Sequence, residues 1–151
     1  MDRINYHELA SQARTDGMEQ FAVGAVIKIN DKFLLLERNP DDFLGGLVEI
    51  PGGKIDQNES IEDALIREVL EETSLTVTKI IKYLESFDYL SGTSKKTRIF
   101  NFLVQTAEDK IKINPDEHIN FFLKNYDEII KERLNISNEC MKIIETADRL
   151  K

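Results

Sequence analysis

The sequence predicts an α/β fold in which a mixed β-sheet is sandwiched between α-helices. Strand-like apolar runs alternate along the chain with amphipathic helical segments. The length of 151 residues, 41% of them hydrophobic, suits a single globular domain spanning 1–151. The first strand-like runs are nearly continuous in apolar character, as in strands that are covered on both faces.

The first part of the chain predicts a short helix and a β-hairpin. Residues 1–20 form a polar N-terminal segment, with a helix expected at 6–13. The apolar runs at 21–29 and 32–38 are separated only by an Asn-Asp pair, which favours a two-residue hairpin turn.

Turn signals and the strongest helical signal follow. Asn-Pro, Gly-Gly and Pro-Gly-Gly motifs occur within 39–53, and a short strand is expected at 47–50. Ser60 followed by Asp63 resembles an N-cap and its partner, so a helix is predicted over 60–73. At about 100° per residue this helix has an apolar arc and, on largely the opposite side, an acidic arc. The apolar arc holds Leu65, Ile66, Val69 and Leu70, and the acidic arc holds Glu68, Glu71 and Glu72.

Two strands and a helical C-terminal segment complete the prediction. Strands are expected at 75–90 and 97–106, joined by a polar loop at 91–96. The C-terminal segment, 115–151, is expected to hold helices near 126–134 and 138–150.

Composition excludes several classes of function. The net charge of -8 argues against nonspecific binding to nucleic acid or to acidic membranes. No apolar run approaches the length that spans a membrane, and the lone Cys140 excludes a disulfide scaffold, so a cytoplasmic location is expected. Cys140 is weighed as a nucleophile, but neither His7 nor His118 has a motif around it that would activate a thiol.

The segment 51–75 concentrates the residues that suggest chemistry. Pro51-Gly52-Gly53 can turn sharply and expose backbone carbonyls. Glu68 and Glu72 are four residues apart, so they share a helix face on which their charges repel. A hard divalent cation would offset this repulsion and would let an acidic protein bind a diphosphate. The alternative is a solvated helix face, which is the common role of helical glutamates.

The combined spacing decides between these interpretations. The chain matches G-x5-E-x7-R-E-U-x-E-E-x-G-U, where U is apolar, except at one position, and so resembles the Nudix box. The matching residues are Gly53, Glu59, Arg67, Glu68, Val69, Glu71, Glu72 and Leu75, with Ser74 in place of the usual glycine. The resemblance implies the Nudix fold, a mixed sheet between helices. Because the usual glycine ends the helix in a left-handed conformation, Ser74 should cost roughly 1 kcal/mol there.

The resemblance also implies an activity, a cofactor and roles for residues. Nudix hydrolases cleave a nucleoside diphosphate linked to another group, using Mg²⁺ or Mn²⁺. By this resemblance Glu68 and Glu72 are the expected metal ligands, followed by Glu71 and the Gly52 carbonyl. Arg67 is expected to pair with Glu59 and to orient the glutamates. The general base is left open between Glu68 and a carboxylate outside the box: Glu85, Asp88, Glu108 or Glu117.

The expected substrate is a small nucleotide. The resemblance favours a nucleoside triphosphate that releases pyrophosphate, or a nucleotide sugar that releases a nucleoside monophosphate. The downstream proline of ADP-ribose-cleaving members has no counterpart in this chain. Phosphate contacts are expected from Lys54, Lys95, Lys96, Arg98 and Arg38, against the alternative of solvated side chains. Core packing is favoured over base stacking for Phe87, Tyr89, Phe100 and Phe102.

Two other functions remain open at this point. A noncatalytic Nudix-fold sensor is one, although such proteins typically lack box glutamates that this chain keeps. An isopentenyl diphosphate isomerase is the other, and it would need an active-site cysteine. Proteins with this box often dimerise, so a homodimer is an expected assembly state.

Overall fold

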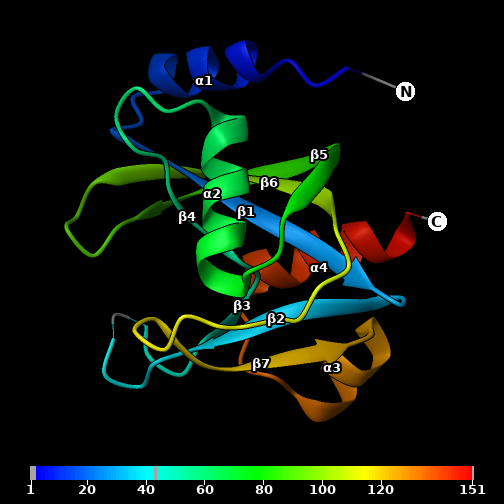
Figure 1. Cartoon of the computed structure of the whole chain (residues 1–151). Helices are drawn as coiled ribbons and strands as arrows, with labels where there is room; N and C mark the ends of the chain where they lie inside the picture. Colours follow the sequence, from blue (N-terminus) through cyan, green and yellow to red (C-terminus); the bar gives the residue numbers. More distant parts are fainter. Residues whose placement is uncertain (1–2, 43, 151) are drawn as a thin grey trace.

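The computed structural model describes residues 3–42 and 44–150, so the outer limits of the expected terminal segments, at 1–2 and 151, lie outside the described residues. Runs of strands are separated by helices along the chain (Figure 1). Their order is α1 (Tyr6–Thr15), β1 (Gln20–Ile29), β2 (Lys32–Arg38), β3 (Val48–Glu49), β4 (Gly52–Lys54), α2 (Ile61–Thr73), β5 (Val77–Leu90), β6 (Lys96–Thr106), β7 (His118–Lys124), α3 (Tyr126–Glu132) and α4 (Asn138–Arg149).

A mixed sheet lies between helices, as the sequence predicts (Figure 1). Its strand order is β3-β2-β1-β6-β5, with β4 also paired to β1 and β7 to β2. The β1–β6 pair is parallel and the other pairs are antiparallel. Alternate residues of β1 point to opposite faces. Val23, Ala25 and Ile27 therefore pack in a core with α1 and α2, while Val26 packs in a second core with α3 and α4.

The predicted hairpin forms, but its two strands soon part. Asn30 and Asp31 both have positive φ, 52° and 64°, which a tight two-residue turn requires. Direct pairing between β1 and β2 is limited to Lys28 with Phe33 and Ile29 with Lys32. Beyond these residues β1 continues between β6 and β4, while β2 continues between β3 and β7. The box segment is thereby held against the middle of β1.

Two strands were not expected from the sequence. Gly52–Lys54, predicted as part of a turn, is strand β4 and pairs with Ala22–Gly24 of β1. A side chain at Gly52 would meet the carbonyl oxygen of Val23, so glycine is required there for close pairing. Strand β7 was missed because its sequence, HINFFLK, alternates polar and apolar residues over only its first four positions.

The two arcs predicted for the box helix are only half correct. Leu65 and Val69 are buried, but Ile66 and Leu70 are 39% and 51% exposed. The glutamates do not lie opposite the core, since Glu68 and Glu72 are only 9% and 3% exposed. The helix is rotated from the predicted orientation because its carboxylates lie over the small residues of β4.

The box helix ends as the resemblance implies. Ser74 caps α2 with φ 66° and ψ 12°, a left-handed conformation, and its backbone N–H donates to the Leu70 carbonyl. Its hydroxyl also donates to the carbonyl of Lys112 at 3.0 Å. The hydroxyl therefore supplies a contact that glycine would lack.

We expect Ser74→Gly to change the free energy of unfolding by less than about 1 kcal/mol. Relief of left-handed strain, worth about 1 kcal/mol, is offset by loss of a hydrogen bond of similar value. Ser74→Ala keeps the strain and loses the bond, so it should be less stable than wild type by about 1 kcal/mol. Urea unfolding of the three proteins measures this, and an alanine variant as stable as the glycine variant would contradict it.

The remaining predicted elements are present with small shifts in their ends. The helices expected at 6–13, 126–134 and 138–150 are α1, α3 and α4. Among residues 3–42 and 44–150, no helix has the length and apolar character needed to cross a membrane.

Candidate active site

The last turns of α2 bring three glutamates beside β4. The side chains of Glu68 and Glu72 are 11% and 4% exposed, whereas that of Glu71 is 53% exposed. A Cβ on Gly53 would lie 2.5 Å from the carboxyl carbon of Glu68. Glycine at 53 is therefore what allows the Glu68 carboxylate to rest on the β4 backbone.

Gly52 contributes its backbone to the same place. Its N–H donates to Oε1 of Glu72 at 2.7 Å. The Pro51 carbonyl accepts from Ala25, and Ile55 donates to the Phe21 carbonyl, so these residues bond toward β1. In an antiparallel pair, residues that bond to the partner strand alternate with residues whose N–H and C=O point away from it. Gly52 is of the second kind, so its N–H and C=O are directed away from β1. The Gly52 carbonyl is thereby left on the side where the glutamates lie.

Arg67 ties the acidic residues together. Its guanidinium donates to both carboxylate oxygens of Glu59 at 2.8 Å and to Oε1 of Glu68 at 2.8 Å. It also donates to Glu71 at 3.3 Å and to the Lys54 carbonyl at 3.0 Å. A planar guanidinium can make these bonds at once, whereas an ammonium group cannot. The geometry places Arg67 where it orients Glu68 and joins the box loop to α2.

The electrostatics of the site favour a bound cation. Burial raises the pKa of Glu72 to about 9, with further increases from Glu117, Glu49 and Glu68 and an opposing effect from the Gly52 N–H. Burial also raises the pKa of Glu68, an effect that Arg67 partly offsets. By contrast, the hydrogen bond from Arg67 lowers the pKa of Glu59 to about 2. Glu72 is thus buried among other carboxylates, and oxygen ligands grouped in this way would suit a hard divalent ion.

The raised pKa of Glu72 gives a pH-dependent stability. The folded protein without metal holds the Glu72 proton up to about pH 9, while the unfolded chain releases it near pH 4.5. The contribution of this group to stability is therefore full below about pH 4.5 and is lost as pH rises toward 9.

We expect the melting temperature in EDTA to fall across this pH window and the increase produced by Mg²⁺ to grow with pH. Thermal unfolding at several pH values, with and without Mg²⁺, measures both effects. A flat metal-free profile between pH 5 and 9 would contradict the prediction.

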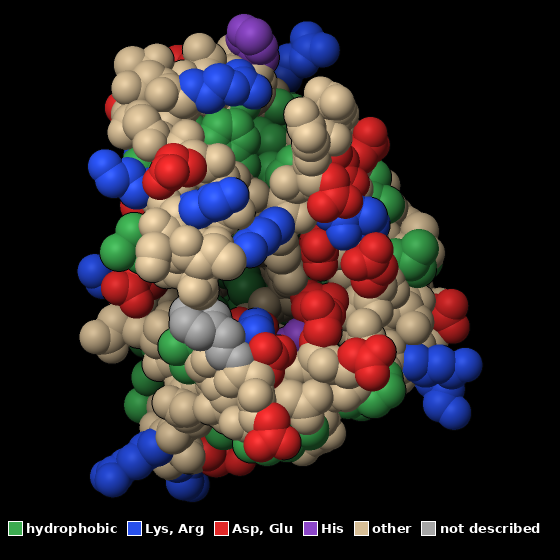
Figure 2. All heavy atoms as spheres, turned by 90° about the vertical axis from the view of Figure 1, so that its left-hand side faces the viewer, with side chains coloured by type: hydrophobic (Ala, Val, Ile, Leu, Met, Phe, Trp, Pro, Cys, Tyr) green, Lys and Arg blue, Asp and Glu red, His purple; other side chains and the backbone are tan. Residues whose placement is uncertain are grey.

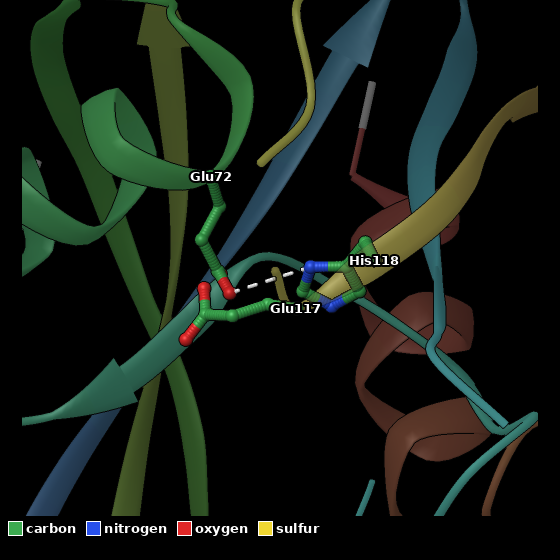
Figure 3. Close-up of side chains that lie close together, drawn as sticks. All are labelled: Glu72, Glu117 and His118. Atoms are coloured by element: carbon green, nitrogen blue, oxygen red, sulfur yellow. Dashed lines mark ion pairs between the residues drawn. The ribbon is translucent and has the colours of Figure 1, made fainter. Parts of the chain in front are cut away.

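A second set of residues completes the site from the other side. Ligand atoms of Glu72, Glu117 and His118 all lie within 4.8 Å of one another (Figure 3). His118 begins β7 and is 1% exposed, and Glu117 directly precedes it. Glu49, at the end of β3, lies 3.0 Å from Nε2 of His118. Glu117 and His118 are distant from the box along the chain, whereas Glu49 lies just before it, and the three meet because β7 and β3 flank β2.

Only part of this set was predicted from the sequence. Glu117 was one of four carboxylates considered outside the box, and it raises the pKa of both Glu68 and Glu72 through its charge. Asp88 instead bonds to Arg98. His118 and Glu49 were missed. A Glu-His pair at the start of an unrecognised strand was the available signal for the histidine.

The predicted phosphate-binding cations lie in different surroundings. Arg38 donates to Oε2 of Glu49 at 3.1 Å and so belongs to the neighbourhood of His118. Arg98 makes three hydrogen bonds to Asp88 and Asp16, so carboxylates already occupy its guanidinium. Lys54, Lys95 and Lys96 are exposed. Figure 2 shows a hollow in one face of the molecule, with acidic side chains along one side and basic side chains above it.

The other candidate residues serve the core. Phe100 and Phe102 are buried as expected, and Phe87 packs against the second core, whereas Tyr89 is 37% exposed. Cys140 lies buried in α4, and burial raises the pKa of its thiol to about 12. A thiol that stays protonated is a poor nucleophile. This argues against the isomerase alternative.

Comparison with known proteins identifies the family. A model of the NUDIX domain matches residues 18–142, which is most of the chain. This chain belongs to the Nudix family. The match begins after α1, so α1 lies outside the matched Nudix domain.

The Nudix relatives of this chain are named for different activities. The chain is 36% identical over 58 residues to an 8-oxo-dGTP diphosphatase of Proteus vulgaris, covering 38% of this chain and 52% of that protein. It is 39% identical over 54 residues to an ADP-ribose pyrophosphatase of Methanocaldococcus jannaschii, covering 36% of this chain and 31% of that protein. The chain thus matches about half or less of the length of these curated relatives.

Solved structures share most of this fold. A MutT protein from Methanosarcina mazei Go1 superposes with a TM-score of 0.73 at 26% identity, covering 86% of this chain and 93% of that chain. Nudix hydrolases generally use divalent metals and act on small nucleotides, and the acidic group around Glu72 suits such a metal.

Proposed function

We propose that this protein is a metal-dependent hydrolase of a phosphoanhydride bond in a nucleoside diphosphate derivative. One observation carries the proposal: two buried glutamates of α2, Glu72 and Glu68, lie against the β4 backbone at Gly52 and Gly53. Burial of a carboxylate such as Glu72 is costly, so such an arrangement is expected where it serves a site. The noncatalytic alternative is disfavoured because the acidic group is intact and buried.

Mg²⁺ or Mn²⁺ would be held by Glu68, Glu72 and the Gly52 carbonyl, with Glu71 at the exposed edge. Such an ion neutralises phosphate charge and polarises the bond that is cleaved. Arg67 and Glu59 act as positioning residues, because they contact Glu68 and the box loop. Arg38, Lys54, Lys95 and Lys96 would attract the substrate phosphates, which the overall charge of -8 would otherwise repel.

Glu117 is the carboxylate that we assign as general base. Water attacks phosphorus, the anhydride P–O bond breaks, and the proton of the water passes to a carboxylate. Glu68 is less suited, because Arg67 already donates to its Oε1 at 2.8 Å. Glu117 is exposed and within 4.8 Å of Glu72, so it can reach a water molecule at the same place. Because a carboxylate has two oxygens, one oxygen of Glu117 can accept the proton while the other contacts a different group.

A nucleoside triphosphate that releases pyrophosphate is the proposed substrate class. Support comes from the 8-oxo-dGTP diphosphatase among the relatives. The ADP-ribose pyrophosphatase relative points the other way, but this chain's prolines are Pro40, Pro51 and Pro115, with none at the downstream position expected for that activity. The single domain over 1–151, the cytoplasmic location and the homodimer stay predictions.

A substrate panel tests the proposal. The purified chain with Mg²⁺ is incubated with nucleoside triphosphates, including an 8-oxo-purine form, and with nucleotide sugars, ADP-ribose and dinucleoside polyphosphates. We expect pyrophosphate and a nucleoside monophosphate from the triphosphates, and no product in EDTA. Turnover of nucleotide sugars or ADP-ribose alone would overturn the triphosphate assignment, and no turnover of any compound would overturn the hydrolase assignment.

A further inference from the structure

One nitrogen atom beside the acidic group has no hydrogen-bond partner among residues 3–42 and 44–150. Nδ1 of His118 is buried and makes no hydrogen bond to any described residue. The side chain is 1% exposed, and Nδ1 faces Oε2 of Glu72 at 3.7 Å (Figure 3). Buried polar atoms are nearly always paired, so an unpaired one at a functional site indicates a missing ligand.

The surroundings of the ring fix which nitrogen can bind. Nε2 lies 3.0 Å from Oε2 of Glu49, and a carboxylate can only accept a hydrogen bond. The proton therefore belongs on Nε2, which leaves a lone pair on Nδ1. Arg38 donates to the same oxygen of Glu49 at 3.1 Å and holds that carboxylate in place. A carboxylate behind a histidine in this way is the usual support of a histidine that ligates a metal.

The distances suit a shared ion. Metal–ligand bonds of about 2.1 Å place neighbouring ligand atoms of an octahedral ion about 3.0 Å apart and opposite ones about 4.2 Å apart. The separation of 3.7 Å between Nδ1 and Glu72 lies between these values. The ligand atoms of Glu72, Glu117 and His118 lie within 4.8 Å of one another. Small side-chain movements would therefore bring all three to one ion.

We propose that His118 is a nitrogen ligand of the metal site, sharing a divalent ion with Glu72 and Glu117, and that it makes the site prefer Mn²⁺ to Mg²⁺. This inference rests on the proposed metal-dependent function and deepens it. Mg²⁺ favours oxygen ligands almost exclusively, whereas imidazole suits transition metals. The other donors are oxygens, which suit Mn²⁺ as well as Mg²⁺, so one added nitrogen shifts the balance toward Mn²⁺.

The test measures metal binding without nucleotide. His118→Asn places an amide group near the position of Nδ1 and removes the imidazole. Mn²⁺ binding is followed by the electron paramagnetic resonance signal of free Mn²⁺, and Mg²⁺ binding by competition. We expect the Kd for Mn²⁺ to rise about tenfold and that for Mg²⁺ to change by less than about threefold. His7→Asn, which changes the exposed histidine of α1, is the matched control and should alter neither value.

A second measurement uses the unaltered protein, so it holds even if the variant fails to fold. Substoichiometric Mn²⁺ is added to protein labelled with ¹⁵N in its histidine rings. Direct ligation broadens the Nδ1 resonance of His118 well before its Nε2 resonance, and before those of His7. Equal broadening of both ring nitrogens, or an unchanged Mn²⁺-to-Mg²⁺ affinity ratio in a folded His118→Asn variant, would overturn the inference. Neither measurement depends on turnover, so the inference about His118 can fail while the hydrolase assignment stands.

Discussion

Glu72→Gln is expected to lower kcat by about a thousandfold while the protein stays folded. The change removes a negatively charged metal ligand, and a thousandfold loss corresponds to about 4 kcal/mol of transition-state stabilisation. Glu72 is not the surface residue that the helical pattern suggested, since it is 3% exposed and accepts a hydrogen bond from Gly52. Glutamine can still accept that bond through its amide oxygen.

Stability separates this effect from misfolding. Because the pKa of Glu72 is raised to about 9, the metal-free protein at neutral pH already carries a neutral side chain there. The glutamine variant should therefore match the wild type in EDTA to within about 1 kcal/mol and should gain less from added Mg²⁺.

Glu62→Gln provides the control for the Glu72 variant. It lies in the first turn of the same helix, about 15 Å away by helix rise. This variant should leave kcat unchanged. If Glu72→Gln turned over substrate at the wild-type rate, the assignment of Glu72 as a metal ligand would be wrong.

Arg67→Lys is expected to lower both stability and activity. A lysine keeps the charge but cannot bond at once to Glu59, Glu68 and the Lys54 carbonyl. We expect the free energy of unfolding to fall by about 2 kcal/mol and kcat to fall at least tenfold, because Glu68 loses its orientation. Urea unfolding and steady-state kinetics measure the two effects.

The acid limb of the stability profile tests the same contacts. Arg67 lowers the pKa of Glu59 to about 2, so the stabilisation is present above about pH 4.5 and is lost as pH falls toward 2. The difference between wild type and Arg67→Lys should shrink over that window. Arg149→Lys, which alters the exposed pair with Glu145 on α4, is the control and should have little effect. A constant difference between wild type and Arg67→Lys down to pH 2 would contradict the role given to Glu59.

Local patterns predicted most of the helices and longer strands, and the box spacing predicted which residues meet on α2. The backbone cap from Ser74 to Leu70 and the pair between Arg67 and Glu59 join residues close along the chain, so their arrangement follows from short-range geometry. The rotation of α2 could not be predicted, because the space that receives Glu68 is made by Gly53 of a strand that resembled a turn. His118 and Glu49 were missed for a related reason. Their meeting with Glu72 depends on β3 and β7 pairing with β2, and no local pattern contains that information.

The parallel pairing of β1 with β6 has a consequence for how the chain folds. Gln20 aligns with Thr97 and Ile27 with Val104, so the central contact of the sheet closes a loop that contains the whole box. Such distant contacts raise the contact order and slow folding, because the entropy of loop closure is lost before the contacts form. If a domain of this size folds cooperatively, the glutamates come together in the same transition that closes the sheet, so a newly synthesised chain gains its affinity for cations when the domain folds.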